Sequence, residues 1–173
     1  YTSPTQINAI VPFEISGRTQ TSVVVSFNGV LSTPIVAQVA NTAPGVFTAS
    51  TTGSGQGSIL NQNYQPNSAS QPAAKGSVVQ IFATGGGVTN PAGATGGVAP
   101  SSTLEPLVAA SVTVIIGGQP ATVEFAGSAP GLVEGVLQIN AVVPADAASG
   151  SAAPVVITVN GAVSSSAVTL AIQ

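Results

Sequence analysis

The chain has 173 residues, of which 44% are hydrophobic, so it is long enough for one large or two small domains. Only 4% of the residues are charged, two basic and five acidic, with no histidine and no cysteine. This composition argues against a nucleic-acid-binding surface, a Ser–His catalytic pair, disulfides and thiolate metal sites. The apolar runs are too short for a membrane-spanning helix, and the many Val, Ile and Thr residues predict a folded chain rather than a disordered one.

The first predicted element is "QINAIVP", residues 6–12, and a β-hairpin follows it in "TSVVVSFNGVLSTPIVAQVA", residues 21–40. Two runs rich in β-branched residues flank Asn28 and Gly29 there. An Asn-Gly pair between such runs is the strongest short signal for a hairpin, because both turn positions need positive φ.

The middle of the chain alternates between polar loops and strands. A segment rich in Ser, Gly, Asn and Gln, residues 48–76, contains one short predicted strand at 58–60. A longer strand, "SVVQIFATG", follows, and then an irregular stretch at 85–106 that we interpret as a surface loop. Another hairpin, "SVTVIIGGQPATVEFAG", turns at Gly117 and Gly118.

The end of the chain repeats its beginning. "QINAVVP" at residues 138–144 matches residues 6–12, and "VVITVNGAVS" at 155–164 matches "VVVSFNGVLS" with Asn160 and Gly161 at the turn. Val36 then falls on Val168 in the same register. Because the register holds across separated blocks, this is a true internal repeat.

Short strands separated by Gly, Pro and Asn predict an all-β fold of tandem immunoglobulin-like β-sandwich units. We place a partial unit, the C-terminal half of a repeat, at residues 1–50 and a complete unit at residues 51–173. The partial unit is expected to lack its N-terminal strands, the counterparts of residues 77–125. Another chain could supply them, as could an upstream segment of the parent protein, or the remaining strands could join the second unit.

Several motifs resemble a known family. "YTSPTQINAIVPFEISG", "GQGSILNQNYQPNS", "AAKGSVVQIFATGGGVTNPAG" and "IGGQPATVEFAGSAPGLVEGVLQINAVVPADAASG" are similar to an uncharacterised C-terminal domain of secreted proteins that is expanded in acidobacteria, the Solibacter type. The resemblance covers essentially the whole chain. It implies an immunoglobulin-like, export-associated module, and it assigns no catalytic residue.

Candidate catalytic chemistry is sparse. The carboxylates are Glu14, Glu105, Glu124, Glu134 and Asp146. Glu14 and Asp146 fall at equivalent positions after the Val-Pro of each repeat, and Glu124 points away from its strand neighbours, so an acid–base pair is not expected. Lys75 is the only lysine and precedes a strand, and the Gly-rich stretch after residue 84 lacks the helix of a phosphate loop. We predict no catalytic residue, no cofactor, no metal and no enzymatic activity.

The sequence therefore favours a secreted structural protein, extracellular or at the cell surface, that self-assembles as a filament by donor-strand complementation. Its expected partners are other copies of itself or an upstream segment of the parent protein. Neither nucleic acid nor a membrane span is expected. The alternative is a spacer or polysaccharide-binding accessory module of a larger secreted protein, with Tyr64 as its ligand platform. The predicted strand-pairing interface consists of Gln6, Ile7, Asn8, Ala9, Ile10, Val11, Val23, Val24 and Val25.

Overall fold

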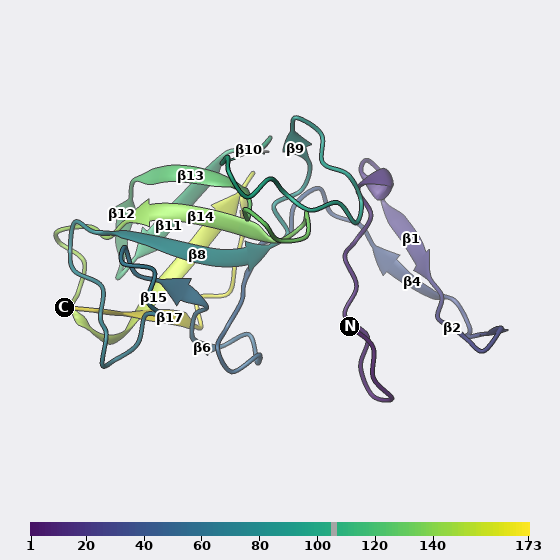
Figure 1. Ribbon diagram of the computed structural model, residues 1–173, viewed down its shortest axis with the longest axis horizontal. Helices are drawn as coiled ribbons and strands as arrows, with labels where there is room; N and C mark the ends of the chain where they lie inside the picture. Colours follow the sequence, from purple (N-terminus) through teal and green to yellow (C-terminus); the bar gives the residue numbers. More distant parts are fainter. Residues whose placement is uncertain (105–106) are drawn as a thin grey trace.

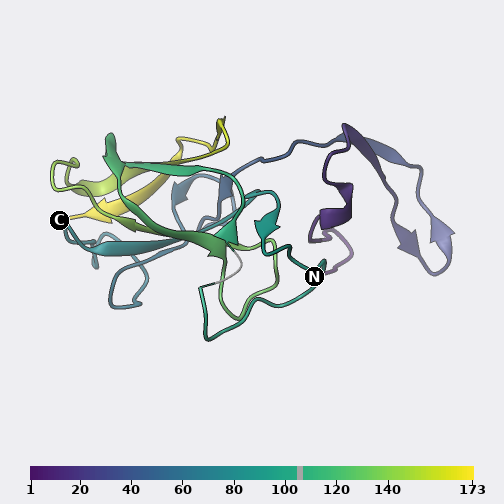
Figure 2. The same ribbon diagram turned by 90° about the horizontal axis from the view of Figure 1, so that it is seen from above.

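The protein consists of a β-sandwich and an arm that projects from it (Figures 1 and 2). The structure, a computed structural model, describes residues 1–104 and 107–173. We call residues 1–40 the arm. The chain passes from the arm into the sandwich at residues 42 and 43, where Thr42 Oγ1 donates to the Val159 carbonyl at 3.0 Å and the Ala43 N–H donates to the Gly85 carbonyl at 3.0 Å.

One sheet of the sandwich has seven strands. Their order is β5-β8-β14-β13-β10-β9, with β7 also pairing β8, and every pairing is antiparallel. The strands are β5 (Gly45–Val46), β7 (Ile59–Leu60), β8 (Val78–Thr84), β9 (Thr89–Asn90), β10 (Leu107–Val108), β13 (Val123–Ser128) and β14 (Leu137–Val142).

The other sheet has six strands in the order β12-β11-β15-β17-β6, with β16 also pairing β15. The short strand β6 runs parallel to β17, and the other pairings are antiparallel. The strands are β6 (Gly55–Gln56), β11 (Val112–Ile116), β12 (Gln119–Ala121), β15 (Gly150–Val159), β16 (Ala162–Val163) and β17 (Val168–Ile172).

The hydrophobic core lies between these two sheets. Burial alternates along β8 and along the second half of β15, as expected when every second side chain points inward. Val79 and Ile81 of β8 and Ile139 of β14 meet Ile157 of β15 and Leu170 of β17, and all five are fully buried. The β-branched residues thus form strands because a second sheet covers their apolar face.

The side chain of Asn67 pairs with β17 beyond the end of β6. Asn67 Oδ1 accepts from the Ala171 N–H at 2.7 Å, and Asn67 Nδ2 donates to the Ala171 carbonyl at 2.9 Å. A second bond from Asn67 Nδ2, to Asn61 Oδ1 at 2.9 Å, fixes the amide in place. The amide therefore extends the pairing of β17 past β6, where the Ala73 N–H also donates to the Ala171 carbonyl at 2.9 Å.

The arm contains only short elements. A 3-10 turn, η1 (Phe13–Ile15), leads to β1 (Gln20–Val23), which pairs antiparallel with β4 (Ile35–Gln38). The hairpin β2 (Ser26–Phe27) with β3 (Val30–Leu31) forms the tip. In both views these strands extend away from the sandwich (Figures 1 and 2).

The predictions of an all-β fold and of three hairpin turns are confirmed. Asn28 and Gly29 have φ of 49° and 80°, and Asn160 and Gly161 have 49° and 84°. At the remaining turn, Gly117 and Gly118 also have positive φ, between the paired residues Ile116 and Gln119.

Three details differ from the sequence prediction. The sandwich begins ahead of residue 51, because β5 pairs with β8 and Val46 is buried in the core. The predicted surface loop at 85–106 includes strand β9, which pairs with β10, while Glu105 lies outside the described residues.

The third difference is a shift in the register of the repeat. Residues 164–167 separate β16 from β17, whereas only residues 32–34 separate β3 from β4. The longer connection shifts the pairing by one residue, so that Val168 has Ile35 as its counterpart rather than the expected Val36.

The paired turns allow a matched stability test. A valine at Gly161 would have to adopt positive φ, which is unfavourable for β-branched residues, although no atom lies within 4 Å of its Cβ. We expect Gly161→Val to lower the free energy of unfolding of the sandwich by about 1 kcal/mol or more. Thermal and denaturant unfolding measure this.

Gly29→Val is the matched control, because its turn has the same conformation but lies at the tip of the arm, away from the core. It should leave the main unfolding transition unchanged. Equal effects of the two substitutions would contradict the separation of arm and sandwich.

Candidate interaction surface

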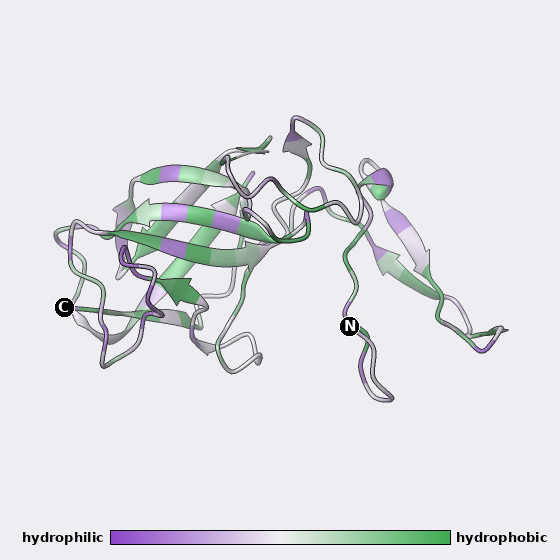
Figure 3. Ribbon diagram, viewed as in Figure 1, coloured by the Kyte–Doolittle hydropathy of each residue, from purple (hydrophilic) through white to green (hydrophobic). Residues whose placement is uncertain are grey.

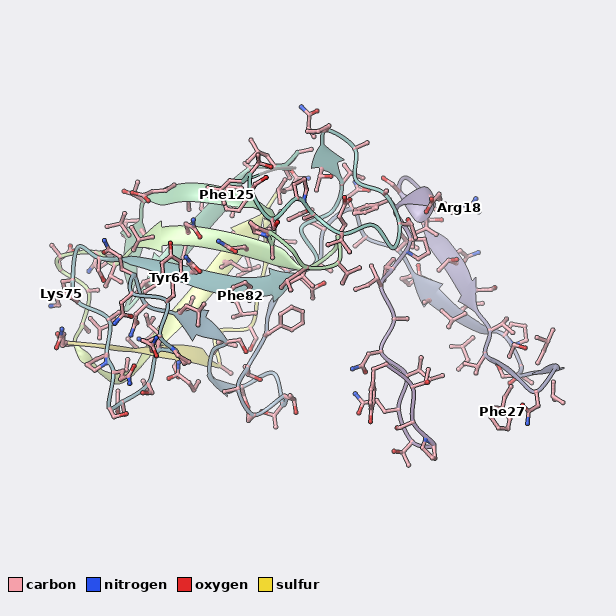
Figure 4. All side chains as sticks on the ribbon, viewed as in Figure 1. Arg18, Phe27, Tyr64, Lys75, Phe82 and Phe125 are labelled. Carbon is pink, nitrogen blue, oxygen red and sulfur yellow. The ribbon has the colours of Figure 1, made fainter. Side chains whose placement is uncertain are left out.

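The arm exposes apolar side chains that its counterpart in the sandwich buries. Val155, Ile157 and Val159 of β15 are 0% exposed, whereas the residues at the equivalent positions, Val23, Val25 and Phe27, are 51%, 42% and 75% exposed. Figure 3 shows apolar residues along β4 and toward the tip of the arm, and Figure 4 places Phe27 near its far end. The same sequence pattern thus forms a core in one place and an open surface in the other.

Beside the turn, the two copies nevertheless make the same hydrogen bonds. The Val25 N–H donates to Ser32 Oγ at 3.0 Å and the Ser32 N–H to the Val25 carbonyl at 2.9 Å. In the sandwich, Ile157 and Ser164 make the same two bonds at the same lengths. The tip of the arm is therefore already folded as it would be inside a sandwich, but its apolar side chains are exposed and not buried under a second sheet.

One edge of the arm's β1–β2 segment carries unpaired backbone groups. The Val39 N–H donates to the Thr19 carbonyl, and Val25 pairs with Ser32, so the odd-numbered residues face β4 and β3. The even-numbered residues Val24 and Ser26 consequently face outward, since backbone groups alternate along a strand. Within the described residues, no strand pairs with β1 or β2 on that side. In the sandwich, β11 fills the corresponding position next to β15.

The segment 6–11 was predicted as part of the strand-pairing interface, but it forms no strand. Among the described residues, its one ladder contact is a bridge between Ile7 and Thr2, at which Gln6 bonds to Ser3 and Asn8 bonds to Tyr1 through their backbone groups. Its side chains still alternate as in a strand, because Gln6 Nε2 donates to Asn8 Oδ1 at 2.7 Å, as Gln138 Nε2 does to Asn140 Oδ1 at 2.9 Å in β14. Ile7 is 52% exposed, whereas Ile139 in β14 is 0% exposed. The segment is thus a second apolar surface whose counterpart is buried.

Residues 10–14 hold the base of the arm against the sandwich. Ile10 packs against Gly135, where an added Cβ would lie only 3.0 Å from Ile10 Cγ2. The Phe13 N–H donates to Thr95 Oγ1 at 2.9 Å, and this hydroxyl donates to Glu14 Oε2 at 2.6 Å. A small cavity of about 20 Å³ remains beside Phe13, which is room for no more than a water molecule. No motif in the sequence predicted this junction.

The junction also changes the acidity of Glu14. The hydrogen bond from Thr95 holds the pKa of the Glu14 carboxyl below its ordinary value of 4.5, and a backbone bond within Glu14 acts in the same direction. Both bonds stabilise the ionised form. Glu14 is therefore a structural contact at the base of the arm.

Glu134 and Lys75 lie apart from each other and have separate surroundings. Glu134 is buried and accepts the Ala94 N–H at 2.7 Å, so it fastens the loop that carries Thr95. Lys75 lies at the other end of the molecule from the arm (Figure 4). Within residues 1–104 and 107–173, no group of three or more acidic side chains could hold a metal ion. No helix in this part of the chain is long and apolar enough to cross a membrane.

Tyr64 is 70% exposed and has a φ of 62° in the turn after β7. Its N–H donates to the Asn61 carbonyl at 2.8 Å, which fixes the turn while the ring projects outward. The structure thus presents Tyr64 as an exposed aromatic residue on the sandwich, more exposed than Phe47 and distant from Phe27 (Figure 4).

Comparison with known proteins finds no matching family model, no significantly similar curated protein and no significantly similar solved structure.

The Glu14 contact can be tested by titration. Thr95→Val removes the hydroxyl donor, so we expect the pKa of Glu14 to rise toward its ordinary value. An NMR pH titration of the side-chain carboxyl measures the change. Thr103→Val, on an exposed residue in the same connection, should leave the pKa unchanged.

The sign of the stability effect follows from the lowered pKa. The contact contributes stability above the ordinary pKa of Glu14, and this contribution is lost as the pH falls through the lowered pKa of the folded state. An unchanged Glu14 titration in Thr95→Val would contradict the assignment of the cause.

Proposed function

We propose that this chain is a non-enzymatic, extracellular or cell-surface structural protein that self-assembles through its arm. In this proposal the arm belongs to a second immunoglobulin-like unit, and a strand donated by a neighbouring copy completes it. The observation that carries the proposal is the contrast in burial between Val23, Val25 and Phe27 and their fully buried counterparts in β15.

The energetics favour covering this surface. Burying the remaining exposed area of these three side chains would contribute on the order of 3 kcal/mol, since full burial of one large apolar side chain is worth about 1.5–3 kcal/mol. The outward N–H and C=O groups of Val24 and Ser26 would also gain partners. A β-strand supplies both the apolar cover and the hydrogen bonds, whereas an apolar ligand supplies only the first.

The charge distribution favours another copy as the donor. The arm carries one acidic residue, Glu14, and one basic residue, Arg18, and the whole chain has a net charge of only −3. Copies therefore repel each other weakly. Because a donated strand and its acceptor edge are different surfaces, the contact is head-to-tail and extends into a filament unless its rotation closes a ring.

The proposed location rests on composition. With 4% charged residues, Ser, Thr, Asn, Gln and Gly provide most of the polar groups. Such a surface suits an exported protein, and the motif resemblance to a domain of secreted proteins supports the same location.

Self-association is the direct test. We expect the molar mass from light scattering to rise with protein concentration, and electron microscopy to show elongated assemblies. Phe27→Asp places a charge in the exposed apolar surface and should weaken association by about tenfold or more, the equivalent of roughly 1.4 kcal/mol.

Tyr64→Asp is the control, because it changes an equally exposed aromatic residue on the sandwich. It should associate like the unmodified chain. A chain that remains a compact monomer at all soluble concentrations would contradict self-assembly.

The alternative function is a spacer or polysaccharide-binding accessory module. The exposed ring of Tyr64 favours it, because sugar rings stack on exposed aromatic side chains. With no tryptophan and only two tyrosines in the chain, tyrosine fluorescence would report binding at this position. Under this alternative, polysaccharides perturb the fluorescence, and Tyr64→Ala abolishes both the change and the binding seen by affinity electrophoresis. Binding that survives Tyr64→Ala would exclude Tyr64 as the platform.

A further inference from the structure

The sandwich shows which kind of strand fits next to the open edge of the arm. β11 lies antiparallel to β15, with Val112 opposite Val159, Val114 opposite Ile157, and Ile116 opposite Val155. Every second residue of β11 is thus apolar and faces the core side of the sheet. A donor for the arm requires the same spacing, because Phe27, Val25 and Val23 occupy the positions of Val159, Ile157 and Val155.

Residues 6–11 have this spacing. Ile7, Ala9 and Val11 are apolar at alternate positions, and all three are exposed. The hydrogen bond between Gln6 and Asn8 places two polar side chains together on the opposite face. The segment therefore already presents an apolar face and a polar face. The backbone groups of Gln6 and Asn8 bond to Ser3 and Tyr1 of the same chain, so pairing with an acceptor strand in this register exchanges these bonds for bonds to that strand.

Ile10 connects this segment to its own sandwich without using the apolar face. In an extended segment the side chain of Ile10 points to the side opposite Ala9 and Val11. Its packing against Gly135 thus anchors the end of the segment and leaves Ile7 and Ala9 accessible.

The geometry of one chain separates the segment from its own hairpin. From the junction at residues 10–14, the N-terminal segment and the strands β1 and β4 run in different directions in both views (Figures 1 and 2). The bonds of Phe13 and Glu14 to Thr95 hold this divergence. Pairing within one chain would require the junction to open.

We propose that residues 6–11 are the donor strand and that they pair antiparallel with the outward edge of residues 22–28 in a neighbouring copy. The register taken from β11 and β15 places Ile7 opposite Phe27, Ala9 opposite Val25, and Val11 opposite Val23. This inference rests on the proposed self-assembly and specifies its donor, its acceptor edge and its register.

Disulfide trapping can test this register, because the native chain contains no cysteine. Val25 directs its own N–H and C=O toward Ser32, so the expected pair of Ala9 and Val25 is not hydrogen-bonded across the new edge. Such pairs have Cα atoms about 4.5 Å apart, which allows a disulfide. The experiment mixes two single-substitution proteins, Ala9→Cys and Val25→Cys, and oxidises them mildly.

We expect a cross-linked heterodimer in at least fivefold excess over the control mixture of Ala9→Cys with Val24→Cys. The control cysteine lies one position along the strand and faces the other side of the sheet. A peptide of residues 5–12 should suppress the cross-link, and the same peptide with Ile7→Asp should not. Both substituted positions are exposed, so the folded state is retained.

Other outcomes would overturn the inference. Equal yields of cross-link from Val25→Cys and Val24→Cys would show that the two segments touch but do not pair in the proposed register. If the segment instead covered the hairpin face to face, as β14 covers β15, the two positions would lie about 10 Å apart and no disulfide would form. A cross-link confined within one chain of the double variant Ala9→Cys/Val25→Cys would exclude donation between copies.

Light scattering on the same unoxidised samples separates the two proposals. Assembly without the heterodimer would remove the donor and register assigned here while leaving self-assembly intact. A monomer without any cross-link would remove both.

Discussion

The alternating apolar residues of a strand can be buried only when a second sheet covers their face and neighbouring strands pair with both edges. In the sandwich, β15 meets both requirements, since β11 and β17 flank it and the sheet containing β8 and β14 covers it. The arm repeats the sequence of this strand and its hairpin but not its surroundings. The exposed surface is thus a direct consequence of placing the same pattern in a different context.

The contrast is sharpest at strand edges. In the sandwich, Asn67 and the Ala73 N–H continue the pairing of β17 beyond β6, and this requires a buried amide whose polar atoms are all hydrogen-bonded. No comparable side chain covers Val24 and Ser26 among the described residues. Proteins usually defend such edges with charge, and this edge has none. An edge without such protection is what we expect where another strand pairs with it.

Sequence patterns predicted the strands and turns of this structure but not the contacts between residues that are distant in the sequence. The hairpins at Gly29, Gly117 and Gly161 were predictable because Asn-Gly and Gly-Gly turns are local. The one-residue shift before β17 and the pairing of β5 with β8 depend on contacts made only in the folded chain. The same holds for the site: its apolar residues were predicted, but residues 6–11 form no strand, because a strand needs a partner that sequence alone does not place.

The junction at residues 10–14 gives the arm a defined direction, and this has a consequence for any assembly. In a head-to-tail polymer, the rotation between subunits is set by the angle between the donor and acceptor surfaces. Here both surfaces are in the arm and are fixed to the sandwich through Ile10, Phe13 and the Thr95–Glu14 hydrogen bond. A flexible linker would give a disordered chain of subunits, whereas these contacts favour one repeated angle. The contacts at residues 10–14 would thereby determine the angle between neighbouring subunits of the proposed filament.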